Sequence, residues 1–155
     1  MENFCQETVR DNMASPAETV APEMTVGDLL RLFSSNEFDS YPVVREGQMV
    51  GVVSRADSIK PFAIKPASAL EFDKIMGTTV AEIMSSQVIT VGPDAMLEQV
   101  VQLMTTLDFE SFPVIDNENR VTGIIAREDV IRALARCGSR SSLPLPLHPL
   151  GYAIA

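Results

Sequence analysis

Apolar side chains recur at helical spacing in two long segments of the chain, residues 25–38 and 95–109. Positions three and four apart lie on one face of an α-helix, so each segment is predicted to be an amphipathic helix. Pro22 and Pro93 lie just before these segments, where a proline is well tolerated. The pattern is carried by Leu29, Leu30, Leu32 and Phe33 in the first segment and by Leu97, Val100, Val101 and Met104 in the second.

Each predicted helix is followed by two short runs rich in β-branched residues, separated by a turn that contains Gly or Asn. Such a pattern predicts a β-hairpin. The predicted strands are residues 41–45, 50–54, 112–116 and 121–126. The remaining elements are helical turns at 9–13 and 80–84, short strands at 18–20 and 88–91, and closing helices at 55–60 and 127–136.

The elements occur twice because the sequence itself repeats. A shift of 71 residues, which becomes 72 after one inserted turn residue, brings identical residues onto one another. The matched pairs include Thr19 and Thr90, Pro42 and Pro113, Gly51 and Gly123, and Asp57 and Asp129. The predicted fold class is therefore α+β, with two pseudo-symmetric β-α-β-β-α repeats whose small sheets pack together with helices outside.

The repeats define the predicted domains: 8–60 for the first repeat, 61–79 for a connector, 80–136 for the second repeat and 137–155 for a proline-rich tail. The connector is expected to be ordered, because Ser68, Glu71 and Gly77 suit the N-cap, capping-box and C-cap positions of a helix. The tail is interpreted either as a docking peptide for a partner or as a surface tail, and the second interpretation is favoured.

Composition and net charge restrict the classes of partner that the chain is expected to bind. The chain of 155 residues is 46% hydrophobic and carries a net charge of -9, which opposes binding to a nucleic acid polymer. A small anionic ligand stays possible, since it needs only one local cation or an amide-lined pocket. No apolar run is long enough to span a bilayer and the N-terminus is acidic, so we expect a cytoplasmic protein without membrane contact.

Catalytic and metal chemistry are not expected. The single histidine, His148, lies in the tail, and we find no nucleophile–base pair, metal-ligand cluster or phosphate loop. Neither an enzyme nor a required cofactor is therefore predicted. Cys5 and Cys137 could form a disulfide or a redox switch, but two reduced thiols are the favoured interpretation for a cytoplasmic chain.

Two motifs, each present twice, resemble those of CBS (cystathionine β-synthase type) domains. Residues 51–57 (GVVSRAD) and 123–129 (GIIARED) look like the family's Gly-apolar-apolar-Ser/Thr-x-x-Asp signature, and residues 39–44 and 110–115 look like its second hallmark. The resemblance covers about residues 8–136. It implies a tandem pair, called a Bateman module, that forms disc-like homodimers and binds AMP, ADP, ATP or S-adenosylmethionine in clefts between the repeats.

The first signature has a physical interpretation. Ser54 ends a predicted strand and Asp57 lies in the first turn of the next helix, so both can face one spot. A carboxylate suits the two hydroxyls of a ribose, while Ser54 and Arg55 suit a phosphate. Alternatively, Ser54 and Asp57 form only a helix-capping pair.

The second copy departs from the signature, because Ala126 replaces the expected hydroxyl while Arg127 and Asp129 remain. The site built on Asp129 is therefore expected to be weaker, altered or empty. The resemblance further implies that the adenine slot is lined by residues near both hairpins: Thr19, Ser40, Tyr41, Pro42, Thr90, Ser111, Phe112 and Pro113. The rings of Tyr41 and Phe112 could stack on a base or simply pack in the core.

Two functions stay open at this point. The first is a regulatory module that senses an adenosine nucleotide or S-adenosylmethionine and acts on an unidentified effector protein. The alternative is a structural dimerisation or protein-interaction module whose pockets are vestigial.

Overall fold

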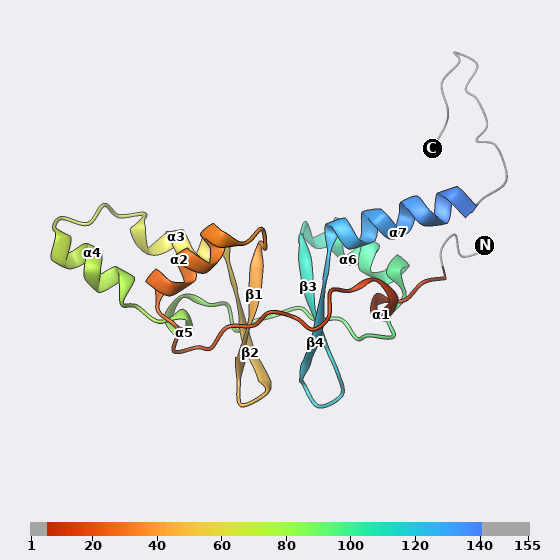
Figure 1. The fold of residues 1–155 in the computed structure, drawn as a ribbon, viewed down its shortest axis with the longest axis horizontal. Coiled ribbons are helices and arrows are strands. Elements are labelled where there is room, and N and C mark those ends of the chain that lie inside the picture. The colour runs from red at the N-terminus through yellow and green to blue at the C-terminus, as the bar shows by residue number, and fades with distance from the viewer. Residues whose placement is uncertain (1–5, 141–155) are drawn as a thin grey trace, which may run out of the picture.

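The computed structural model describes residues 6–140 and contains two small antiparallel hairpins that lie side by side, with helices at either end (Figure 1). The hairpins pair β1 (Ser40–Arg45) with β2 (Gln48–Ser54), and β3 (Ser111–Ile115) with β4 (Val121–Ala126). The hairpin tips touch, because Asn119 and Met49 exchange hydrogen bonds of 3.2 Å. The predicted α+β class with two similar repeats is confirmed.

The predicted first strand of each repeat is reduced to a single bridge. Val20 pairs in parallel with Val43, where the Val20 N–H donates to the Pro42 carbonyl at 3.0 Å, and Val91 pairs in the same way with Val114. Each sheet therefore has two strands, not the three that were expected. Pro22 follows two residues after Val20 and has no N–H to continue a ladder.

The main helices end earlier or later than their apolar patterns suggested. They are α2 (Val26–Ser35), α3 (Arg55–Ile59), the 3₁₀ turn η1 (Lys60–Phe62), α6 (Leu97–Leu107) and α7 (Arg127–Arg140). The hydroxyl of Thr25 caps α2 by accepting a hydrogen bond of 3.2 Å from the Asp28 N–H. The buried faces of these helices form two cores, one against each hairpin.

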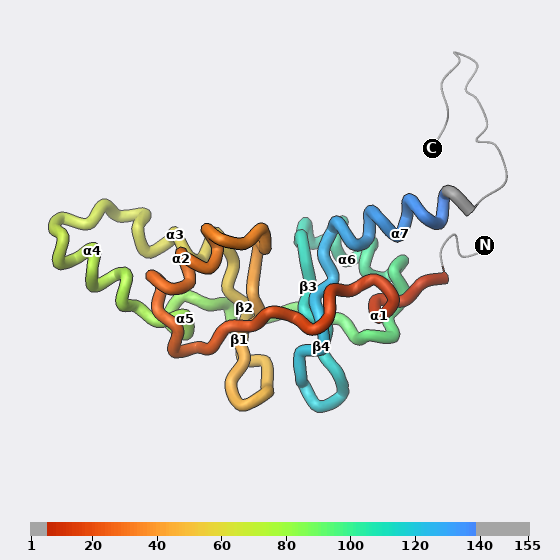
Figure 2. Tube along the Cα trace, in the orientation of Figure 1, coloured from red at the N-terminus to blue at the C-terminus, as the bar shows by residue number. Residues whose placement is uncertain are grey.

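The short opening helices are exchanged between the repeats. Val9 of α1 (Val9–Asn12) is fully buried in the core around Phe112, whereas Val80 of α5 (Val80–Ile83) is buried in the core around Tyr41. Figure 2 shows the N-terminal trace running from the side of α6 and α7 across the hairpins to α2. Neither repeat closes its core with its own residues alone.

This crossing explains the glycine of the signature. The segment that leads from α5 runs over β2, where the Val52 N–H donates to the Ser85 carbonyl and the Ser85 N–H donates back, both at 2.9 Å. A Cβ at Gly51 would lie 2.7 Å from both the Ser85 oxygen and the Met84 sulfur, and one at Gly123 would meet Met13 and Ala14 equally closely. Only glycine fits where two backbones approach so closely.

The connector contains the predicted helix, α4 (Ala69–Met76). The Ser68 hydroxyl accepts a hydrogen bond of 3.2 Å from the Glu71 N–H, as expected for an N-cap. The Glu71 carboxylate accepts from the Ala67 N–H at 2.7 Å, one residue before the cap. Gly77 follows as the C-cap.

The expectation of reduced thiols is wrong for Cys137, which is disulfide-bonded. The expectation rested on the usual redox state of cytoplasmic proteins, whereas the fold brings α7 against the N-terminal helix, where Arg136 donates to Asn12 and, at 3.3 Å, to Glu7. Cys5, His148 and the tail beyond residue 140 lie outside the described residues. Within residues 6–140, no helix is long and apolar enough to cross a membrane.

Candidate ligand-binding clefts between the two repeats

The first cleft has a volume of about 310 Å³ and takes its walls from both repeats. It opens where β2 passes into α3, so Ser54 and Asp57 both face it. The residues that line it are Asp39, Ser40, Val52, Ser54, Asp57, Ser85, Gln87, Val88, Ile89, Asp108, Phe109, Glu110, Ser111 and Pro113.

Ser54 and Asp57 form the capping pair that the sequence left open as an alternative. The Asp57 N–H donates to the Ser54 hydroxyl at 3.1 Å, and the Ser54 N–H donates to Oδ2 of Asp57 at 2.9 Å. Lys60 donates to Oδ1 of Asp57 at 3.0 Å. Each carboxylate oxygen has two lone pairs, so Asp57 keeps acceptor capacity toward the cleft while it caps α3.

The second cleft is related to the first by the repeat and has a volume of about 580 Å³. Oδ2 of Asp129 accepts from the Ala126 N–H at 2.8 Å, while Arg132 donates to its other oxygen. Ala126 has no hydroxyl, so the reciprocal half of the capping pair is missing. The lining residues are Ala14, Pro16, Ala17, Glu18, Glu37, Phe38, Asp39, Ser40, Ser111, Ile124, Ala126, Glu128, Asp129 and Arg132.

Ser40 and Ser111 line both clefts and join them. They begin β1 and β3, and their hydroxyl oxygens lie 3.1 Å apart in a hydrogen bond. The sequence had placed each of them beside an adenine slot through the family resemblance, and the structure brings the two together at the pseudo-twofold contact between the hairpins. A ligand in either cleft would therefore meet the same pair of hydroxyls.

The two arginines of the signatures line neither cleft. Arg55 donates to the Asn36 carbonyl at 2.6 Å and lies 5.2 Å above the ring of Phe33, and its Nε is 3.9 Å from Asp39. Arg127 lies 3.4 Å from Asp108 on the side of α6 and α7. Each arginine thus lies beside a carboxylate that lines the first cleft, Asp39 for Arg55 and Asp108 for Arg127.

The aromatic residues of the second hallmark are core residues. Tyr41 packs against Phe33 with ring centroids 5.0 Å apart, and Phe112 is buried in the other core. Burial raises the pKa of the Tyr41 phenol above its ordinary value, and the Glu18 carboxylate raises it further. Both rings are buried in the cores, and neither lines a cleft.

The remaining predicted residues are dispersed. Pro113 lines the first cleft, whereas Pro42 lines neither cleft and its carbonyl accepts from Val20. Thr19 lines neither cleft, and Thr90 lies in a small pocket beside the hairpin tips.

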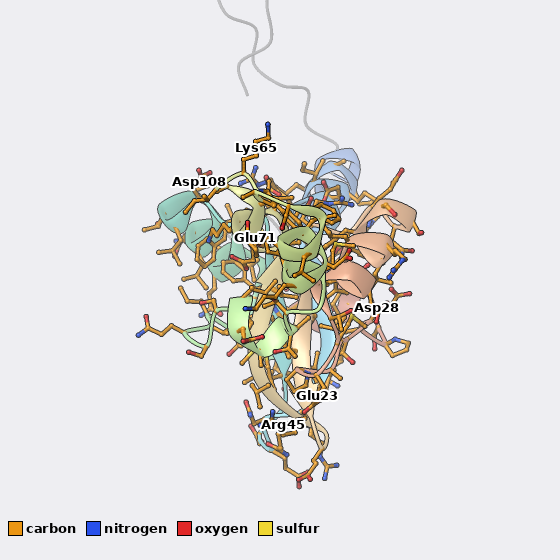
Figure 3. The ribbon with its side chains drawn as sticks, turned by 90° about the vertical axis from the view of Figure 1, so that its left-hand side faces the viewer. Glu23, Asp28, Arg45, Lys65, Glu71 and Asp108 are labelled. Carbon is orange, nitrogen blue, oxygen red and sulfur yellow. The ribbon has the colours of Figure 1, made fainter. Side chains whose placement is uncertain are left out.

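Sequence reasoning missed most of the acidic and apolar walls of the first cleft. Asp39 and Glu110 occupy matching positions in the repeat, at the shift of 71, and they lie next to the shared serines. Asp108 stands at the mouth with its side chain 98% exposed, and Figure 3 shows it projecting from the end of α6. The repeated acidic-Phe-acidic-Ser pattern before each hairpin was the signal that could have found these carboxylates.

Comparison with known proteins identifies the family. The CBS domain family matches residues 8–57 and 80–136, which is more than half of the chain. The chain belongs to the CBS domain family. Protein MJ1225 of Methanocaldococcus jannaschii is 29% identical over 133 residues, and its crystal structure superposes with a TM-score of 0.72. The match covers 83% of this chain and 48% of MJ1225, so this CBS chain spans about half the length of that relative.

Two further CBS structures contain bound adenosyl compounds. CBSX2, from Arabidopsis thaliana, was solved in complex with AMP; it is 27% identical with a TM-score of 0.70, and the match covers 84% of this chain and 98% of CBSX2. The CBS domain pair of protein MJ0100 was solved with 5′-methylthioadenosine and S-adenosyl-L-methionine. It is 26% identical with a TM-score of 0.68, over 84% of this chain and 97% of that one.

Proposed function

We propose that this CBS pair is a regulatory module that binds an adenosyl ligand, of the class of AMP, ADP, ATP or S-adenosylmethionine, in the first cleft. The observation that carries the proposal is the position of Ser54 and Asp57 in one cleft wall opposite residues of the second repeat. The CBS pairs of CBSX2 and MJ0100, each covered nearly in full by this chain, bind such compounds.

The walls of the first cleft suit a nucleoside. Asp57 offers acceptors for the two ribose hydroxyls, and Ser54 offers a hydroxyl beside them. Ile89 and Phe109 are 37% and 41% exposed, although large apolar side chains are usually buried. An adenine ring placed against them would remove this apolar surface from water.

Calorimetric titration with AMP, ATP and S-adenosylmethionine tests the proposal, and a wild-type protein that binds none of them refutes it. Ser54→Ala is expected to weaken binding by roughly threefold to tenfold, because a neutral hydrogen bond is worth about 1 kcal/mol. The matched control is Thr25→Ala, which removes a helix cap of the same kind from α2, away from both clefts. Equal loss of binding in both variants would trace the effect to lost stability instead of lost contact.

A second candidate function is a structural dimerisation or interaction module with vestigial pockets. It is favoured by a groove of about 440 Å³ between α6 and α7, lined by apolar residues that include Val101, Met104, Val130 and Leu134. Ile131 stands beside this groove and is 60% exposed. We propose that two copies of the chain pair through these helices, in either function, and that an effector protein reads the state of the dimer.

Sedimentation velocity tests the pairing. The wild type is expected to sediment as a dimer at micromolar concentration, and Ile131→Glu is expected to shift it to monomer, because a carboxylate would be buried without a partner. Ile64→Glu is the control, since Ile64 is more exposed than Ile131 and lies in the connector. If the wild type sediments as a monomer, the second candidate function is refuted. The ligand-binding proposal is then tested by the calorimetric titrations only.

A further inference from the structure

We infer that the first cleft selects adenosyl ligands without phosphate groups, those that are uncharged or cationic at the 5′ side of the ribose. The inference rests on the proposed function and deepens it, because it separates compounds that share the same nucleoside. It comes from the charges that line the cleft and from the position of the nearest cations.

All of the charged residues that line the first cleft are acidic. Asp57 stands in the wall beside Ser54, Asp39 and Glu110 stand next to the two shared serines, and Asp108 stands at the mouth. No lysine or arginine is among the lining residues in the described part of the chain. A phosphate bound here would be brought close to several like charges, which disfavours it.

The nearest cations pair with lining carboxylates, but none of them lines the cleft itself. Lys60 pairs with Asp57, but its side chain is 72% exposed, so its charge is largely screened by water. Arg55 donates to the Asn36 carbonyl, and its Nε is 3.9 Å from Asp39. Arg127 lies 3.4 Å from Asp108, on the side of the groove between α6 and α7. No ion pair involves Glu110 in residues 6–140.

The same walls suit a cationic group. Carboxylates form charge-assisted hydrogen bonds with ammonium groups and attract a sulfonium by charge. The apolar surfaces of Ile89, Phe109 and Pro113 remain available to the purine ring, as any adenosyl ligand requires. S-adenosylmethionine carries a sulfonium and an ammonium against one carboxylate, and 5′-methylthioadenosine is uncharged, so both avoid the repulsion that AMP and ATP meet.

The test is a set of titrations of the full chain with S-adenosylmethionine, 5′-methylthioadenosine, AMP and ATP, in one buffer at low ionic strength. We expect the first two to bind at least about tenfold more tightly than AMP, and ATP to bind most weakly. Raising the salt concentration is expected to reduce the difference in affinity between the two groups of ligands, because salt screens the partly exposed carboxylates.

Glu110→Gln keeps the shape of the side chain and removes one charge from the wall. The variant is expected to bind AMP more tightly and S-adenosylmethionine more weakly, each by roughly threefold to tenfold. Its affinity for 5′-methylthioadenosine is expected to stay unchanged, because that ligand carries no charge. The unchanged neutral ligand shows that the cleft stays folded. Glu118→Gln is the matched control, since Glu118 lies in the turn of the second hairpin and pairs with Arg120.

The outcomes separate the two ideas. If AMP binds the wild type more tightly than 5′-methylthioadenosine, the charge selection is overturned while the adenosyl-binding proposal stands. If Glu110→Gln changes the affinity for AMP, S-adenosylmethionine and 5′-methylthioadenosine in the same direction and to the same extent, the carboxylate does not act through its charge and the inference fails. If none of the four compounds binds, the proposed function itself fails.

Discussion

Asp57 uses one carboxylate for two purposes. Its Oδ2 accepts from the Ser54 N–H at the start of α3, and the same side chain stands in the wall of the first cleft. A substitution at Asp57 would therefore change the stability of the helix and the binding of a ligand together. This coupling is why the binding test is better made at Ser54, with the cap of α2 as its control.

Gly51 is one of two glycines at which the crossing of two backbones leaves no space for a Cβ, the other being Gly123. Gly51→Ala is expected to lower the free energy of unfolding by roughly 1–3 kcal/mol, because its Cβ would meet a carbonyl oxygen at 2.7 Å and the structure would have to shift. Gly123→Ala is expected to behave alike. Urea denaturation measures the change, and Gly92→Ala is the control, since no atom lies within 4 Å of a Cβ placed there. Equal stability of the Gly51 and Gly92 variants would contradict this account.

The chemistry of single residues was only partly predictable. The repeat and the signature placed Ser54, Asp57, Ser40 and Ser111 near a cleft, and the structure has them there. The signature could not show where Arg55 points, because its direction depends on the Asn36 carbonyl, far from it along the chain. Contacts of this kind arise from the tertiary fold and leave no local pattern.

At the scale of elements, apolar periodicity predicted the helices and hairpins well, because each helix or strand has one face toward a core. It missed the exchange of α1 and α5. Val9 and Val80 occupy matching positions in the repeat, so the sequence alone is the same whether each helix packs on its own repeat or on the other. Only the path of the chain over β4 and β2 decides between them.

Because α1 and α5 are exchanged, a cavity made by a substitution in one repeat is predicted to destabilise the core of the other repeat. Val9→Ala is expected to cost about 2 kcal/mol, the value of two buried methyl groups and part of a cavity. Hydrogen exchange should then rise most in α6 and β3, which share a core with Val9, whereas Val80→Ala should raise it most in α2 and β1. The two variants serve as controls for each other. A larger rise in α2 and β1 than in α6 and β3 for Val9→Ala would mean that each helix packs on its own repeat.

At the scale of the whole molecule, the exchange ties two sequence repeats into one cooperative structure. Each core lacks a fully buried valine unless the other repeat supplies it, and the shared serines and the hairpin tips add contacts between the halves. Two similar sequences joined by a connector could have folded as separate units. The observed arrangement instead predicts that neither half keeps its core when the other unfolds.

This cooperativity can be measured with the tyrosines of the chain. The sequence has two tyrosines and no tryptophan, so the variant Tyr152→Phe leaves Tyr41 as the fluorophore that reports the first core. Circular dichroism reports the helices of both cores. In urea, the tyrosine and dichroism transitions are expected to coincide in midpoint and slope, as a two-state transition requires. Val9→Ala weakens the second core and should move both transitions together to lower urea, whereas a shift of the dichroism signal alone would mean that the repeats unfold independently.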